Sequence, residues 1–248
     1  MAVSSQKLSR LRRVISILLA AIAFCAFLYF NPAAYRDIDE IEVNPSDITI
    51  KSTQTKATSL LAKDVLESLA VKEKDTSAKY YRKLFYDDWS TAADGCNMRE
   101  AILKRDLKNI VLKGCKVQSG TLADPYTGQQ IDFVRGQDTS ANVQIDHVVA
   151  LSNAWSTGAY AFDEQKRYAI SQDPLNLLAV DGQANQDKLD QDAANWLPPN
   201  VAFRCQYVAR QISVKYKYEL WVTPAEKAAM LEILAKCPDE PTLGLEDL

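Results

Sequence analysis

The 248-residue chain is predicted to fold as an α+β protein that follows an apolar N-terminal segment. Three observations predict this class: a basic and then apolar start, short strand-like stretches in the middle of the chain, and helical apolar spacing around them. Because 47% of the residues are apolar, the chain can bury one core of ordinary size. One globular domain is therefore expected.

The first thirty residues have the pattern of an export segment. Four basic residues and no acidic ones precede the apolar run 14–30. This run is at the short end of what spans a bilayer core of roughly 30 Å, and it is longer than a signal-peptide core of about 7 to 15 residues. The pattern favours a transmembrane anchor at 1–30, with the N-terminus in the cytoplasm and the rest outside the membrane. Cleavage near Ala34, which would give a secreted protein, is the alternative.

Composition divides the remainder into three parts. Residues 31–77 are polar and predict a stalk outside the membrane, with one amphipathic helix at 58–71. Bulky aromatic residues then gather from Tyr80 onward, so the globular domain is expected over 78–238 and a short tail over 239–248.

The first half of this domain predicts a helix and a hairpin. Apolar spacing indicates a helix over 98–112 that ends at Gly114. The turn signal Asp124-Pro125-Tyr126-Thr127-Gly128 separates stretches 116–122 and 130–134, which can pair as two strands.

The second half predicts another strand pair and several helices. The strands are expected at 143–151 and 175–180, with a helical insertion at 154–170 between them. Asp181 is a good N-cap for a helix that runs through 191. A helix is expected at 202–216, and the capping box from Thr223 to Glu226 starts a last helix that ends near 235.

Four cysteines follow the N-terminal segment, an even number for a compartment where disulfides persist: Cys96, Cys115, Cys205 and Cys237. No pair has zinc-ligand spacing, and the single histidine lies far from all of them, so a zinc finger is poorly supported. Three pairings are possible, and the simplest joins Cys96 to Cys115 and Cys205 to Cys237.

Net charge argues against tight, nonspecific binding to nucleic acid. The chain carries −3, but its first thirty residues hold four of the 29 basic side chains, so the remainder has 25 basic against 32 acidic groups. The exported part is thus about −7. This net charge remains compatible with a nuclease that binds a short stretch of nucleic-acid backbone through a metal and a few cationic side chains.

The strongest candidate for a catalytic or metal-binding site in the sequence is the pair Asp146-His147, which contains the only histidine. It interrupts the apolar stretch 143–149, where a charged pair is costly to bury without partners. Adjacent side chains on a strand point to opposite sides, so the two are poorly placed to bind one ion together. They suit a division of labour, in which Asp146 binds a metal and neutral His147, with an ordinary pKa near 6.5, takes a proton.

Further polar residues follow on the helix predicted after Asp181. Asn185 and Lys188 are three residues apart on it and share a face. An amide oxygen and an ammonium on one face can serve a hard cation and a phosphate.

In several ordered segments the sequence resembles the HNH nucleases, and within them the C-terminal domain of the GmrSD restriction enzymes in its exported bacterial single-domain form. The resemblance covers roughly 80–237, and the segments that carry it are Asp124-Pro125-Tyr126-Thr127-Gly128, 145–151 with Ala154-Trp155, 173–185 with Lys188, Trp196-Leu197-Pro198-Pro199, and Arg204-Cys205. One departure is Ala150, where the family usually has proline.

The resemblance implies a ββα-metal core and a metal-dependent endonuclease that cuts nucleic acid, DNA in the first place. It implies Asp146 and Asn185 as metal ligands, His147 as general base, Asn176 as the residue that fixes the loop around the histidine, and Lys188 near a phosphate. Carboxylate and amide oxygens suit Mg²⁺, or Mn²⁺, better than zinc. The rival hypothesis is a noncatalytic, disulfide-stabilised surface module on a degenerate HNH scaffold. No protein partner is predicted.

Overall fold

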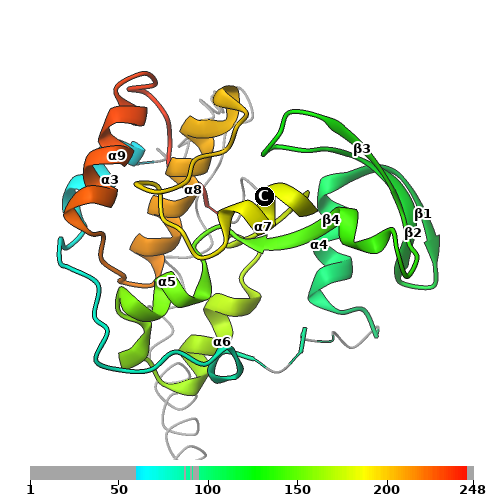
Figure 1. Cartoon of the computed structure of the whole chain (residues 1–248), viewed down its shortest axis with the longest axis horizontal. Coiled ribbons are helices and arrows are strands. Elements are labelled where there is room, and N and C mark those ends of the chain that lie inside the picture. The colour runs from blue at the N-terminus through cyan, green and yellow to red at the C-terminus, as the bar shows by residue number, and fades with distance from the viewer. Residues whose placement is uncertain (1–59, 87, 90, 92–94, 245–248) are drawn as a thin grey trace, which may run out of the picture. The chain divides into compact units, whose positions relative to one another are not determined.

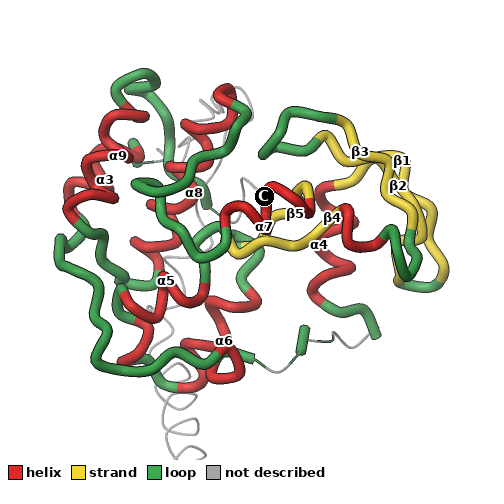
Figure 2. The backbone as a smooth tube through the Cα atoms, viewed as in Figure 1, coloured by secondary structure: helices red, strands yellow, loops and turns green. Residues whose placement is uncertain are grey.

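The computed structural model describes residues 60–86, 88, 89, 91 and 95–244. Within them the fold is α+β, with short helices around two small antiparallel sheets (Figures 1 and 2). The helices are α3 (Ala62–Ser68), α4 (Met98–Asp106), α5 (Leu151–Ser156), α6 (Glu164–Gln172), α7 (Gly182–Lys188), α8 (Arg204–Lys217) and α9 (Pro224–Leu234). The strands are β1 (Leu107–Lys113), β2 (Lys116–Ala123), β3 (Gln130–Val134), β4 (Val143–His147) and β5 (Leu177–Asp181).

The first sheet has the order β1-β2-β3 and packs against α4. The predicted hairpin is confirmed, since β2 pairs with β3 from Ser119↔Val134 to Ala123↔Gln130. In its turn, Asp124 Oδ2 accepts bonds from the Thr127 amide and hydroxyl, while Asp124 Oδ1 accepts from the amide of Asp181 at 2.9 Å. The turn is therefore tied directly to the end of β5.

The predicted helix over 98–112 is half wrong, because α4 ends at Asp106 and the chain continues as β1. β1 pairs with β2 in a hairpin whose turn includes Gly114 at φ +60°, a conformation that glycine adopts without strain. A short apolar run satisfies helix and strand spacing alike, and here pairing with β2 decides the outcome.

The second sheet joins β4 to β5, with the pairs Val143↔Asp181 through His147↔Leu177. The strand predicted at 143–151 is thus shorter, and the predicted insertion is made of α5, a short turn of helix and α6. Helix α7 begins directly after β5, where Asp181 caps it through a bond from Ala184 N at 2.8 Å, as predicted. It stops at Lys188 rather than 191, because Leu189 has φ +51°.

Three helices form a layer whose buried core also includes Leu178 and Val180 of β5. α3 packs against α8 and α9 through the buried residues Ala62, Val65 and Leu66. The stretch 62–68 is thus part of the domain core and not of a polar stalk, because its apolar face has a partner. The capping box of α9 is confirmed, with Thr223 and Glu226 each bonded to the other's backbone.

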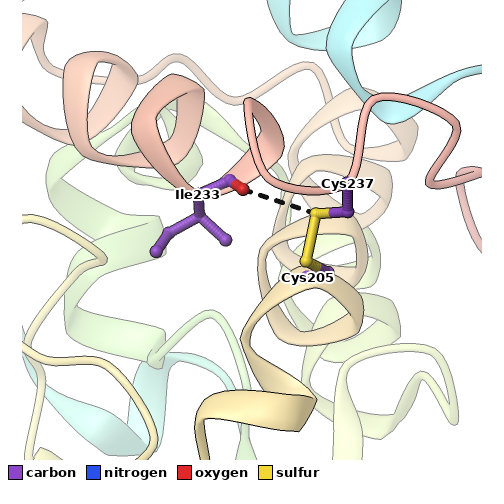
Figure 3. Close-up of a disulfide and its surroundings, with 3 residues drawn as sticks. All are labelled: Cys205, Ile233 and Cys237. Atoms are coloured by element: carbon purple, nitrogen blue, oxygen red, sulfur yellow. Dashed lines mark hydrogen bonds between the residues drawn. A yellow bond between two sulfur atoms is a disulfide. The ribbon is translucent and has the colours of Figure 1, made fainter.

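One of the two predicted disulfides is present. Cys205 at the start of α8 is bonded to Cys237 just after α9 (Figure 3). The second pairing is not formed: the Cys96 thiol contacts the carbonyl oxygen of Cys115 at 3.5 Å instead of its sulfur. Proximity of these two segments was predicted correctly, and the bond between their sulfurs was not.

The predicted anchor at 1–30 and the stalk up to residue 59 lie outside the described residues. Among the residues that are described, no helix combines the length and apolar character needed to cross a membrane. The C-terminal tail predicted at 239–248 is described up to 244, and Thr242 N donates to Leu60 O at 2.7 Å beside α3.

Candidate active site

A cavity of about 570 Å³ is lined by residues of β4 and α7. These two elements lie side by side (Figure 1). Three of the predicted site residues line the cavity, namely Asp146 and His147 from β4 and Asn185 from α7. The antiparallel pairing of β4 with β5, and the immediate start of α7 after β5, bring these residues together from positions almost forty apart in sequence.

Asp146 is buried, with 5% of its surface exposed. Its Oδ2 accepts a hydrogen bond from the Tyr126 hydroxyl at 2.5 Å, and its Oδ1 accepts one from Lys188 Nζ at 3.0 Å. Burial raises the pKa of Asp146, and the ammonium of Lys188 and the hydroxyl of Tyr126 oppose that rise. The carboxylate is therefore rigidly oriented before any ligand arrives.

His147 is equally buried, and its orientation is fixed at one nitrogen. Nε2 lies 2.9 Å from the carbonyl oxygen of Ser171, which can only accept, so Nε2 carries the proton and Nδ1 has the lone pair. The ring stacks on Trp89 with centroids 5.8 Å apart. Burial lowers the pKa of His147 to about 3, helped by the charges of Arg82 and Lys188 and opposed by Ser171.

Asn176 lies wholly inside the protein and holds the backbone that follows the histidine. Its Oδ1 accepts from Val149 N at 2.8 Å, its Nδ2 donates to Val149 O at 3.1 Å, and its carbonyl accepts from Val148 N. These bonds fix the turn between β4 and α5. Contacts of this kind are what a loop-fixing residue needs.

Asn185 is partly exposed on α7 and faces β4. Its Nδ2 donates to Gln144 Oε1 at 2.9 Å, which sets the orientation of the amide. The amide oxygen is then the atom that Asn185 can offer to a cation.

Lys188 does not reach the cavity surface, although its position in the sequence suggested contact with a phosphate. Its side chain is 0% exposed, and Nζ donates to Asp146 Oδ1 at 3.0 Å and to the His147 carbonyl at 2.9 Å. Both acceptors belong to the β4 end that carries the site. The contacts of Lys188 indicate a positioning role.

Comparison with known proteins places this chain in a family. The family described as "GmrSD restriction endonucleases, C-terminal domain" matches residues 46–233. The chain belongs to this family. A protein of the fungus Arthroderma benhamiae, named "Uncharacterized secreted protein", is 37% identical over 179 residues, which cover 71% of this chain and 84% of that protein. The family match begins before α3, in agreement with the packing of that helix in the domain core.

The comparisons correct two predictions. The predicted single-pass location in the cell membrane was wrong: the relative bears the name of a secreted protein, and no helix in the described part of the chain could cross a bilayer. A membrane partner is accordingly not supported. The bacterial origin implied by the resemblance is not supported either, since this relative is fungal.

Two residues at the site were not found from the sequence. Tyr126 lies in the predicted turn 124–128. Its hydrogen bond to Asp146 depends on how this turn packs against β4, and no local sequence pattern encodes that packing. Arg82 lines the same cavity as His147 from a segment 65 residues earlier, and nothing around it in the sequence marks it. Tertiary contact alone reveals both.

Proposed function

We propose that the chain is a secreted, metal-dependent endonuclease that hydrolyses phosphodiester bonds of nucleic acid, DNA in the first place. The observation that carries this proposal is the convergence of Asp146, His147 and Asn185 on one cavity, in a chain that belongs to an endonuclease-type family. In this reading β4, β5 and α7 form the ββα unit of an HNH nuclease. The name of the fungal relative and the basic, apolar start of the chain support secretion.

The donor set fits a divalent cation. An ionised carboxylate has about four lone-pair sites. Asp146 can therefore bind a cation through an unused lone pair while it still accepts its hydrogen bonds from Tyr126 and Lys188. Asn185 adds an amide oxygen, and two hard oxygen donors with room for water favour Mg²⁺ or Mn²⁺. When bound, such a cation supplies electrostatic stabilisation of the charge that develops on the phosphate oxygens.

His147 is the proposed general base, acting through Nδ1. A water oxygen attacks phosphorus while its proton passes to Nδ1. The bond from phosphorus to the sugar oxygen breaks, and the departing oxygen takes a proton from solvent. The Nε2–H bond to Ser171 holds the ring in the tautomer that this step needs. A pKa of about 3 keeps the ring neutral in the free protein.

The test is cleavage of plasmid DNA by the full chain with Mg²⁺ or Mn²⁺, with and without a chelator. His147→Ala removes the base and should reduce the rate by at least about 10², the lower end for loss of general-base catalysis. Asp146→Ala should lose cation binding as well as activity, whereas His147→Ala should retain cation binding by calorimetry.

Two results would contradict the proposal. A folded His147→Ala protein that cuts as fast as wild type would remove the histidine from the mechanism. A wild-type chain that cuts neither DNA nor RNA with either metal would favour the noncatalytic module.

A further inference from the structure

The cavity at the candidate active site is poor in positive charge. Its lining includes the carboxylates of Asp146 and Asp190, and Arg82 is its single Lys or Arg side chain among the residues that the structure describes. Lys188 pairs with Asp146 from inside the protein. The described lining itself therefore offers a nucleic-acid phosphate one positive side chain, Arg82, in addition to any cation held by Asp146 and Asn185. The position of Arg82 therefore helps to decide where the phosphate can bind.

Lys188, the cation expected there from the sequence, is not available. Its side chain is 0% exposed and is held by Asp146 Oδ1 and the His147 carbonyl. Freeing it to meet a ligand would leave the buried carboxylate of Asp146 without its ion pair, which is strongly unfavourable. The anion has to be met by a different side chain.

Arg82 has the exposure and the orientation that this task needs. It is exposed, and Nη2 donates to the Tyr86 hydroxyl at 2.5 Å, while the guanidinium lies 5.2 Å from the centre of the Tyr86 ring. The Tyr86 ring in turn lies 6.0 Å from the ring of His147. Tyr86 thus holds the guanidinium close to the proposed base.

Arg82 also keeps its charge for a ligand. Among the described residues, no carboxylate forms an ion pair with it. One donor of the guanidinium is used by Tyr86, and the others can form the paired bonds that a phosphate accepts.

We propose that Arg82 binds a phosphodiester group of the nucleic-acid substrate beside His147, in the role that the sequence suggested for Lys188. This inference rests on the proposed function and adds to it the residue that places the substrate anion. The geometry separates two cations: Lys188 positions Asp146 from within, and Arg82 meets the substrate from the solvent side.

The experiment measures binding and cleavage separately with the full chain. Binding of a fluorescein-labelled 16-base-pair DNA duplex is followed by anisotropy in Ca²⁺ over a range of salt concentrations. Removing one phosphate contact should lower the slope of log K against log salt by about 0.9, so Arg82→Ala is expected to show this change. Cleavage of plasmid by the same variant in Mg²⁺ should fall at least about tenfold.

Two further variants make the test specific. Lys83→Ala removes the same charge from the adjacent exposed residue, which lines a different cavity with Leu84 and Phe85, and it should change neither slope nor rate. Arg82→Lys keeps the charge without the planar fork, and it should restore the slope but only part of the rate.

Three outcomes would overturn the inference: no change in Arg82→Ala, an equal change in Lys83→Ala, or slower cleavage by Arg82→Ala with an unchanged salt slope. A wild-type chain that binds the duplex but never cuts it would refute the proposed hydrolysis, and the salt slope would still decide the role of Arg82. The two failures are therefore distinguishable.

Discussion

The Tyr126 hydroxyl donates to Asp146 Oδ2 at 2.5 Å and so joins the turn after β2 to the strand that carries the candidate active site. Tyr126 is fully buried and packs edge-on against Trp196 and Tyr207. The same turn is bonded to Asp181 through Asp124, at the point where β5 passes into α7. The turn 124–128 therefore has two roles. It reverses the chain between β2 and β3, and its hydrogen bonds hold β4 and β5 in place.

Tyr126→Phe tests the second role by removing one oxygen atom. Loss of a hydrogen bond to a buried charged group should lower the free energy of unfolding by about 1.5–3 kcal/mol, measured with urea. The rate of plasmid cleavage should fall too, because Asp146 loses the contact that orients it. The control is Tyr207→Phe. Tyr207 lies in the same aromatic cluster, and its hydroxyl accepts a hydrogen bond from Gln211. An equal loss of activity in both variants would assign the effect to general packing.

Lys188→Met removes the ammonium beside Asp146 and leaves a buried charge without its partner. Breaking such a pair costs about 3–5 kcal/mol of stability, so the variant should unfold at much lower urea concentration. Added Mg²⁺ should stabilise the variant more than wild type if the cation binds at Asp146. Lys166→Met breaks the exposed pair with Glu219 and should leave stability nearly unchanged. A Lys188→Met protein as stable as wild type would contradict the ion pair.

Local patterns predicted the parts of this fold that are decided locally. The turn before β3, the cap at Asp181 and the capping box of α9 each depend on a few adjacent residues, and each was predicted correctly. β1 was mistaken for the end of a helix because its partner strand decides its structure. α3 was assigned to a stalk because its partners, α8 and α9, lie far along the chain.

The candidate site shows the same difference between features decided by adjacent residues and features decided by distant contacts. The motif residues Asp146, His147 and Asn185 were named from the sequence, and the structure brings them to one cavity. The sequence could not tell which cation is buried and which is exposed, because this depends on the depth of α7 against β4. Lys188, for which the sequence suggested contact with a phosphate, is buried against Asp146, and Arg82, for which it suggested no role, lines the cavity.

Gly182→Ala probes the close packing that sets the depth of α7. A Cβ atom there would lie 2.1 Å from the carbonyl oxygen of Ala141, a backbone atom that cannot rotate away. Overpacking of this kind costs about 1–3 kcal/mol, and the shift of α7 should also displace Asn185 and slow cleavage. Urea unfolding and plasmid cleavage measure the two effects. Gln183→Ala on the exposed side of α7 is the control, and a harmless Gly182→Ala would show that α7 sits less tightly than described.

The disulfide between Cys205 and Cys237 should stabilise the helical layer through the unfolded chain. The two cysteines are 32 residues apart, and closing a loop of that size contributes about 3–4 kcal/mol in the chain-entropy model. The variant with both cysteines replaced by serine should lose this amount in urea unfolding. Wild type in strong reductant should match that variant, and no effect of either change would show that the bridge is not formed in the protein.

The rate at low substrate should be nearly independent of pH between 6 and 8, and this is the sharpest consequence of burying His147. An imidazole with the ordinary pKa near 6.5 is only about one quarter neutral at pH 6, so a solvent-exposed base would lose about three quarters of its rate there. Burial lowers the pKa of His147 to about 3, so the ring stays neutral over this whole range. Because kcat/KM reports ionisations of the free enzyme, its profile should lack an inflection near 6.5. The profile is measured at constant Mg²⁺ and ionic strength, with the melting temperature recorded at each pH to exclude unfolding. A fourfold decrease from pH 8 to pH 6 along a single titration curve would contradict a buried base. Such a decrease would mean that the ring is open to water in the working enzyme and that the stacking of Trp89 on it does not persist there.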